Sequence, residues 1–390
     1  MNPPARTVAL LLNLAHAFDH LFLLIFATAV GAIAADFGFA RWEDLMPYGA
    51  GAFLMFGLAS LPAGRLGDLW GRRQMMLVFF AGMGASALLA AVTQNAWQMA
   101  VALTLLGIFS SIYHPVGIPM LVQGAKRPGA TIGVNGLSGN LGIAAAALIT
   151  GLLVKLLGWR AAFAVPGLAC FAMGWLFARV VPHETEPPHK RERKAAVPLP
   201  AAQLARVLVV ATVASACVGL LFNLSTNGNG RLLDERMRGV VADPATLGML
   251  LAAVYAVASL AQVVVGRLID RFPLQPLQLV IMAMQVPLLL LAAHAQGWAL
   301  YAALLGVMVL IFGAIPFTDA TIVRYVDDRM RSRVAGVRLA MSAGFSSLAV
   351  WALGPAVKSA GFDSLLMAMA GISLLTVAVV MFLPGEPKQA

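Results

Sequence analysis

Long runs of apolar residues, separated by short polar stretches, dominate this chain. Twelve runs can be placed, at approximately 7–35, 46–66, 74–94, 97–122, 130–155, 159–181, 204–228, 245–268, 274–294, 298–321, 333–356 and 362–383. A bilayer core takes about 20 apolar residues of helix per crossing, so each run is long enough to span a membrane. Backbone groups in lipid must be paired within the segment, which favours helices over the alternating strands of a β-barrel. The pattern predicts an all-α integral membrane protein with twelve transmembrane helices.

The segment between the sixth and seventh runs has a different composition. Residues 183–200 combine acidic and basic side chains with four prolines, which is typical of a flexible linker. It divides the chain into an N-terminal unit over residues 1–182, a cytoplasmic linker over 183–203 and a C-terminal unit over 204–390. Each unit holds six of the predicted helices.

Glycines recur between the two halves at a constant spacing. The offset is 203 residues for three pairs: Gly133-Val134 with Gly336-Val337, Gly151 with Gly354, and Gly158 with Gly361. These pairs are in register with the count of apolar runs. The sequence therefore predicts a duplication, with two six-helix bundles related by a pseudo-two-fold axis.

Composition and charge agree with a membrane location. Of the 390 residues, 60% are hydrophobic and 11% are charged, and the mean hydropathy is +0.85; soluble domains carry about 25% charged residues. Of the 27 lysines and arginines, 20 fall in alternate segments and seven in the intervening loops. This bias predicts a multi-pass protein of the bacterial inner membrane with both termini cytoplasmic, and it argues against a nucleic-acid partner.

The length of the first apolar run and the position of the two cysteines bear on processing and redox chemistry. The first run, 7–35, is longer than the 7–15 residues of a signal-peptide core, so we expect a retained helix. Cys170 and Cys217 fall inside predicted spans, where small core residues are expected rather than a disulfide.

A charged, glycine-punctuated turn joins the second and third runs. Gly64 and Gly71 allow tight turns, and Asp68 can accept bonds from nearby arginines. A weaker copy, from Gly266 to Arg271, follows 202 residues later. Such turns suit ionic contacts that form in one state and break in another, although a loop that only fixes topology is the alternative. The predicted gating residues are Gly64, Arg65, Asp68, Gly71, Arg72, Arg73, Asp270 and Arg271.

This turn resembles the loop 2–3 signature of the major facilitator superfamily, which is a glycine, three residues, Asp, two residues and Gly-Arg-Arg. The resemblance extends to the span count, the linker and the repeat. It implies two bundles around a central cavity that rock to expose either side of the membrane, with the aspartate at Asp68 contacting the eleventh helix. The second copy has Phe272, Pro273 and Leu274 in place of Gly-Arg-Arg, so we expect a weaker second hinge.

Polar groups inside the first and fourth runs are candidates for function, because ionisable side chains are costly in a membrane. The candidates are Asn13, His16, Asp19 and His20 in the first run and Ser110, Ser111, Tyr113 and His114 in the fourth, where Pro115 should bend the helix. A carboxylate beside imidazoles suits a proton carrier. The alternatives are a structural hydrogen-bonded cluster, or copper or zinc bound by His16, Asp19 and His20.

The seventh, tenth and eleventh runs supply the candidates of the second half. Residues 223–230 are so polar that the seventh helix should line water or break, with Asn223 and Asn227 on one face. The tenth run contributes Phe317, Thr318 and Asp319, and Arg338 follows early in the eleventh. In the superfamily that the chain resembles, helices 1, 4, 7 and 10 line the cavity, which matches this placement.

A finer resemblance links the histidines of the first and fourth runs to the fosmidomycin-resistance-like branch of drug exporters. That branch carries an acidic residue after its His-Pro, whereas this chain has Val116, and Gly139-Asn140-Leu141-Gly142 replaces the helix-five antiporter signature. We therefore expect a monomeric secondary transporter of a small polar organic solute or drug, slightly favouring export and coupled to protons through Asp19, His20 and Asp319. A metabolite or copper importer and a non-transporting receptor are the alternatives.

The remaining candidates are expected to bind substrate: Asn13, His16, Ser110, Ser111, Tyr113, His114, Asn223, Asn227, Phe317, Thr318 and Arg338. We assign no cofactor and no metal site. No zinc-protease pair, nucleophile elbow or phosphate-binding loop occurs, so we do not expect an enzyme.

Overall fold

The computed structural model describes residues 3–122, 128–182, 201–325 and 328–385, apart from some side chains within helices, among them Asp68, Asp319 and Arg338. The helices of the first half are α1 (Pro3–Asp36), α2 (Ala50–Leu58), α3 (Ser60–Trp70), α4 (Arg72–Ala91), α5 (Ala96–Ser110), α6 (Ile118–Val122), α7 (Pro128–Leu157) and α8 (Trp159–Val180). Those of the second half are α9 (Ala201–Arg236), α10 (Pro244–Ile269), α11 (Leu274–His294), α12 (Gly297–Tyr325) and α13 (Asp328–Val380).

The fold-class prediction is confirmed. Eleven helical stretches in the described ranges are long and apolar enough to cross a membrane. The last of them covers residues 340–380 and contains Gly361, whose φ of 75° and ψ of 172° break the helix, so it comprises two predicted spans. The second predicted span is divided between α2 and α3, and the fourth runs through α5, a short π-helical turn and α6.

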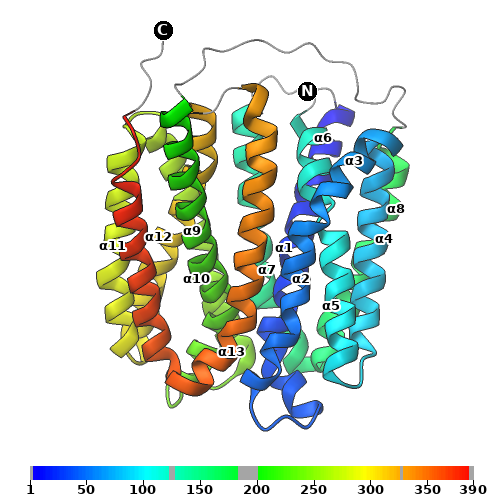
Figure 1. Ribbon diagram of the computed structural model, residues 1–390. Coiled ribbons are helices and arrows are strands. Elements are labelled where there is room, and N and C mark those ends of the chain that lie inside the picture. The colour runs from blue at the N-terminus through cyan, green and yellow to red at the C-terminus, as the bar shows by residue number, and fades with distance from the viewer. Residues whose placement is uncertain (1–2, 123–127, 183–200, 326–327, 386–390) are drawn as a thin grey trace.

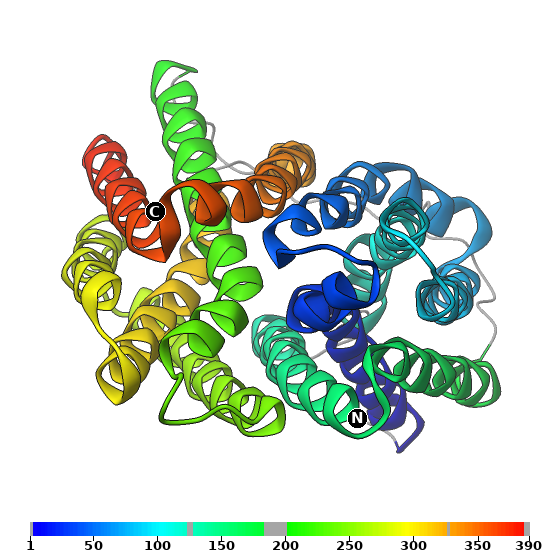
Figure 2. The same ribbon diagram turned by 90° about the horizontal axis from the view of Figure 1, so that it is seen from below.

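The helices form two groups that stand side by side, one built from α1–α8 and the other from α9–α13 (Figures 1 and 2). The start of α1 and the end of α13 lie at the same end of the molecule, which is the upper end in Figure 1. The predicted linker at 183–203 lies almost wholly outside the described residues, so the domain boundaries stay a prediction.

The predicted duplication is visible in the backbone. Gly158 links α7 to α8 with φ 84° and ψ 169°, and its partner in the repeat, Gly361, has φ 75° and ψ 172°. Positive φ is readily available only to glycine, which explains why this residue type occupies both positions. The same turn therefore joins the fifth to the sixth and the eleventh to the twelfth span.

Of the two expectations for the polar end of the seventh span, lining water or breaking, the break does not occur. The helix α9 continues without interruption from Ala201 to Arg236. The amide of Asn223 donates to the carbonyl of Gly219, and the amide of Asn227 donates to that of Asn223. Because these side chains bond back to carbonyls four residues earlier, they remain satisfied within the helix and do not unwind it.

Candidate functional site

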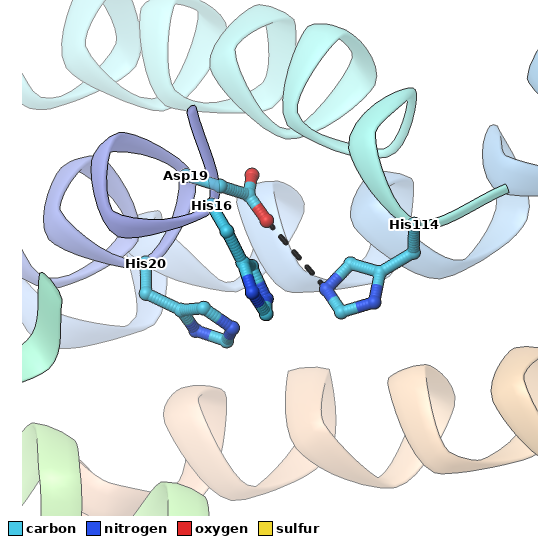
Figure 3. Close-up of side chains that lie close together, drawn as sticks. All are labelled: His16, Asp19, His20 and His114. Carbon is cyan, nitrogen blue, oxygen red and sulfur yellow. Dashed lines mark ion pairs between the residues drawn. The ribbon is translucent and has the colours of Figure 1, made fainter. Parts of the chain in front are cut away.

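Four ionisable side chains meet inside the first bundle. His16, Asp19 and His20 project from α1, and His114 approaches them from the turn that follows α5 (Figure 3). One nitrogen or oxygen of each residue lies within 4.8 Å of those of the other three. We refer to these four residues as the histidine cluster. The sequence placed them on two separate spans, and the fold brings them together.

A π-helical turn from Tyr113 to Gly117 positions His114. Pro115 lies inside this turn and cannot donate a backbone hydrogen bond, which explains the departure from α-helical pairing. The turn packs against α3: a Cβ at Gly64 would lie 3.2 Å from Pro115, and one at Gly67 would lie 2.8 Å from Val116. The glycine-rich motif of the second-to-third connection therefore contacts the segment that carries His114.

Asp19 is fully buried and connects two spans. Its Oδ1 accepts a hydrogen bond from the hydroxyl of Ser110, and its Oδ2 lies 3.6 Å from Nε2 of His114. The Oδ2 atom has no hydrogen-bond partner among the described residues. The side chain of His114 is 27% exposed, although its Nε2 atom, which faces Asp19, is buried.

His16 belongs to a buried hydrogen-bond network that the sequence did not reveal. Its Nδ1 lies 2.7 Å from the carbonyl oxygen of Asn135 on α7, which makes Nδ1–H the donor. The amide of Asn135 donates to Oδ1 of Asn13 and to the hydroxyl of Tyr113, at 2.9 and 2.6 Å. The Tyr113 hydroxyl in turn donates to the carbonyl of Leu12. Asn135 was missed; its amide within an apolar helix was the available signal.

The three imidazoles lie against one another. Ring centroids are 4.9 Å apart for His16 and His20, 5.1 Å for His16 and His114, and 5.9 Å for His20 and His114. On the α7 side, Gly139 leaves room for them, because a Cβ there would come within 2.6 Å of His16. In Figure 3 the imidazoles extend toward the second bundle, where α13 passes in orange. Imidazoles and a carboxylate in this arrangement could hold a proton or a metal ion.

The structure brings seven predicted residues into or beside the cluster: Asn13, His16, Asp19, His20, Ser110, Tyr113 and His114. The hydroxyl of Ser111 instead bonds to Ile108 in its own helix.

In the second bundle, Asn223 donates to Ser346, Thr318 bonds to Ile315, and Phe317 is fully buried in a hydrophobic core. Asp319 lies on α12 and Arg338 on α13, and their side chains are outside the described residues.

The predicted gating residues divide by location. Gly71 turns the chain between α3 and α4 with φ 95°, Arg65 is exposed, and the side chain of Asp68 is outside the described residues. Arg73 is buried and donates from Nε to the carbonyl of Val181 at 2.8 Å and from Nη2 to that of Ala178 at 2.7 Å. Arg73 therefore joins the start of α4 to the end of α8 within one bundle. In the second half, Asp270 caps α10 and Arg271 is exposed.

Two ion pairs join the bundles at the end away from the start of α1. Lys155 on α7 lies 2.7 Å from Asp243 before α10, and Lys358 on α13 pairs with Asp44 before α2. The lysines are 203 residues apart, which is the offset of the repeat. Hydrogen bonding from Lys155 and Thr246 lowers the pKa of Asp243 to about 2. We refer to these two pairs as the paired latch.

Glycines bring the helices close enough for these ion pairs to form. A Cβ at Gly151 would lie 3.0 Å from the carbonyl oxygen of Pro244, and one at Gly354 would overlap the carbonyl oxygen of Glu43. Each glycine precedes its lysine by four residues, so the sequence Gly-x-x-x-Lys-x-x-Gly occurs at 151–158 and again at 354–361. The glycines belong to the repeat predicted from the sequence, and the structure adds Lys155 and Lys358 to it.

Long apolar helices in two repeated bundles, with ionisable groups buried between spans, define a membrane transport protein. A family model described as the Major Facilitator Superfamily matches residues 12–228, which is more than half of the chain. The chain belongs to this superfamily, whose members are transporters and not enzymes.

Curated relatives include the puromycin resistance protein pur8 of Streptomyces alboniger, with 31% identity over 110 residues, covering 27% of this chain and 22% of that protein. A probable actinorhodin transporter of Streptomyces coelicolor is 28% identical over 34% of this chain and 24% of that protein. The tetracenomycin C resistance and export protein of Streptomyces glaucescens is 30% identical over 35% of this chain and 26% of that protein. The matches thus span about a quarter of each relative.

Solved structures share the fold. A bacterial homolog of the human lysosomal transporter Spinster, in an inward-facing and unoccupied conformation, superimposes with a TM-score of 0.73 at 15% identity. The inward-facing and occupied structure gives a TM-score of 0.75 at 14% identity. Each match covers 98% of this chain and 95% of the other.

Proposed function

We propose that this protein is a monomeric, proton-coupled secondary transporter that moves a small polar organic solute or drug across the bacterial inner membrane, with export as the favoured direction. The observation that carries the proposal is the buried carboxylate of Asp19, held between Ser110 and His114 in a transporter fold. The Streptomyces relatives named for puromycin resistance and for tetracenomycin C resistance and export support the direction and the solute class.

Alternating access is supported by the position of the paired latch. The bias of lysines and arginines predicts that the start of α1 and the end of α13 face the cytoplasm. The Lys155–Asp243 and Lys358–Asp44 pairs lie at the other end, so they would close the outer side of the transporter. We propose that the structure represents the state open to the cytoplasm, and that both ion pairs break when the bundles rock.

Coupling is assigned to Asp19 because an isolated charge is costly at this depth. The described titratable groups that face it are His16 and His20 on α1 and Tyr113 and His114 on the π-helical turn. We propose that Asp19 exchanges a proton with the imidazoles as the bundles rock. His20 would take part in this exchange, and Asp319 would be a second proton carrier. Movement of the π-helical turn would then link the proton to the solute.

The binding surface that we propose for the solute combines both bundles. In the first bundle, Asn13, His16, Ser110, Ser111, Tyr113 and His114 offer amide, imidazole and hydroxyl groups. In the second, Asn223, Asn227, Phe317, Thr318 and Arg338 are the candidates. A surface that combines amide, imidazole, hydroxyl and guanidinium groups favours a polar or zwitterionic solute over a lipid.

The proposal is tested by transport in proteoliposomes that contain the purified protein. Puromycin serves as the probe, and a pH gradient is imposed across the membrane. We expect movement of puromycin that follows the gradient in the wild type and in His294→Ala, which lies at the end of α11 away from the cluster. Asp19→Asn should lose the dependence on the gradient. Gradient-independent transport that is equal in both proteins would contradict coupling at Asp19.

A second candidate function, metal transport, is favoured by one observation. The four side chains of the histidine cluster are a possible ligand set, and His114 adds a fourth group to the three residues weighed from the sequence. Replacing puromycin with Zn²⁺ in the same proteoliposomes distinguishes the two cargoes, because only a metal carrier would accumulate the ion.

A further inference from the structure

We infer that His16, Asp19, His20 and His114 form a binding site for one divalent transition-metal ion of the Zn²⁺ type. Three imidazoles and one carboxylate are ligands that Zn²⁺ accepts in tetrahedral sites. Mg²⁺ and Ca²⁺ prefer ligand sets made only of oxygen, so this set does not suit them. The inference concerns the same cluster as the proposed function, but it requires binding only and does not require transport.

The spacing of the cluster is close to that of a coordination sphere. Zn–N and Zn–O bonds of about 2.0–2.2 Å place tetrahedral ligand atoms roughly 3.3 Å apart. The corresponding atoms here lie within 4.8 Å of one another. Small rotations of the imidazoles about their side-chain torsions would close this difference. His16 and His20 pack directly against Gly139, where any side chain would overlap the imidazoles.

The hydrogen bonds around the cluster orient two of its members as ligands. Nδ1–H of His16 donates to the carbonyl of Asn135, so the lone pair of this imidazole is on Nε2. Ser110 holds one oxygen of Asp19 and leaves the other for a further contact. Metal ligands commonly have such outer partners, which fix their tautomer and direction.

Two atoms of the cluster lack hydrogen-bond partners. Nε2 of His16 and Oδ2 of Asp19 are buried and unsatisfied within the described residues. A buried acceptor without a partner costs about 1–3 kcal/mol. A bound cation would satisfy both atoms at once. Two unsatisfied acceptors that face a common space are the observation that distinguishes this cluster from a purely structural network.

The cluster combines a partly exposed residue with a fully buried one. The side chain of His114 is 27% exposed, whereas Asp19 is fully buried. His114 from the turn and His16, Asp19 and His20 from α1 would together coordinate the ion. Since α1 and the turn after α5 carry all four ligands, binding would fix these two segments relative to each other.

The test uses the full-length protein, purified through an affinity tag without histidine. Co²⁺ reports the geometry through its visible absorption, and Zn²⁺ titration calorimetry reports affinity and stoichiometry. We expect one tetrahedral Co²⁺ per chain, displaced by Zn²⁺. His16→Ala and His114→Ala should each weaken Zn²⁺ binding at least tenfold. Ser110→Ala should weaken it by about tenfold, as changes to outer partners do. His294→Ala should bind as the wild type does.

Three results would overturn the inference. They are no stoichiometric metal on the wild-type protein, a Co²⁺ spectrum of octahedral type only, or Zn²⁺ affinity that is unchanged in His16→Ala and His114→Ala. The wild-type spectrum decides the matter even if a variant fails to fold. Absence of gradient-driven puromycin transport by the wild-type protein, together with stoichiometric metal binding, would contradict the proposed function and leave the metal site intact, so the two failures are distinguishable.

Discussion

Nε2 of His114 lies 3.6 Å from Oδ2 of Asp19, which links the fourth span to the first inside one bundle. The imidazole is carried by a π-helical turn, and the carboxylate is carried by a regular α-helix. Because α3 packs against the π-helical turn through Gly64 and Gly67, this contact is connected to the glycine-rich segment between the second and third spans. A movement of either segment would change the distance between the two groups.

Arg73 is expected to stabilise the first bundle. Arg73→Ala removes two hydrogen bonds from a charged donor to the carbonyls of Val181 and Ala178, each worth about 1.5–3 kcal/mol. We expect a clear drop in the thermal unfolding temperature of the detergent-solubilised protein. The exposed Arg65 provides a matched control in the same motif. Equal effects of Arg65→Ala and Arg73→Ala would contradict this role.

Close approach at Gly354 is expected to be required for closure of the paired latch. Gly354→Val places atoms where the carbonyl of Glu43 lies, so the closed end should open. Spin labels on cysteines introduced at positions 41 and 359, in a protein without Cys170 and Cys217, would show a longer distance between the labels by electron paramagnetic resonance. Gly344→Val on the same helix, where a Cβ meets nothing within 4 Å, is the control. An unchanged distance in Gly354→Val would refute the assignment.

The Lys155–Asp243 pair predicts an acid-sensitive contribution to the closed end. The pKa of Asp243 is lowered from 3.8 to about 2 by hydrogen bonds from Lys155 and Thr246. The bonds from Thr246 lie within the cap of α10 itself, so only the part of the lowering that comes from Lys155 depends on closure. That part stabilises the closed form at pH values above 3.8, and it is lost as the pH falls from 3.8 toward 2. The labelled distance should stay constant from pH 7 to 5 and lengthen below 4. A wild-type acid response identical to that of Asp243→Asn would show that another group titrates.

Asymmetry between the two hinges yields a further prediction. The first copy retains the full motif around Asp68, whereas Asp270 caps α10 and is followed by Phe272 and Pro273. Asp68→Asn should therefore reduce puromycin transport far more than Asp270→Asn does. Transport rates normalised to the amount of reconstituted protein provide the measurement. Similar losses in both variants would argue against the asymmetry.

The sequence predicts the helices of this protein well because the membrane dictates them. Apolar length and backbone pairing identify the spans, and the recurrence of Gly158 and Gly361 marks turns that need positive φ. The helix α9 shows the limit of the reasoning. The polarity of residues 223–230 left open a helix that lines water or one that breaks, and bonds from the side chains to carbonyls of the same helix keep it continuous. Polarity does not reveal whether a side chain has a partner within its own helix.

Contacts between distant segments were less accessible from the sequence. The sequence placed His16, Asp19 and His20 in the same apolar run, whereas the π-helical turn that aims His114 at them depends on tertiary packing against α3. The role of Asn135 depends on how α7 crosses α1, which no pattern in either helix specifies. Lys155 and Lys358 were visible as an exact repeat, and their partners Asp243 and Asp44 became evident only when the bundles were placed together.

The most direct test of the account is the transport of protons by wild-type and Asp19→Asn protein. A pH-sensitive dye inside proteoliposomes would record proton movement when puromycin is added outside. We predict a puromycin-dependent pH change in the wild type and in His294→Ala, and its absence in Asp19→Asn at equal reconstitution. A pH change of the same size in Asp19→Asn would contradict the central claim that this buried carboxylate couples protons to the solute.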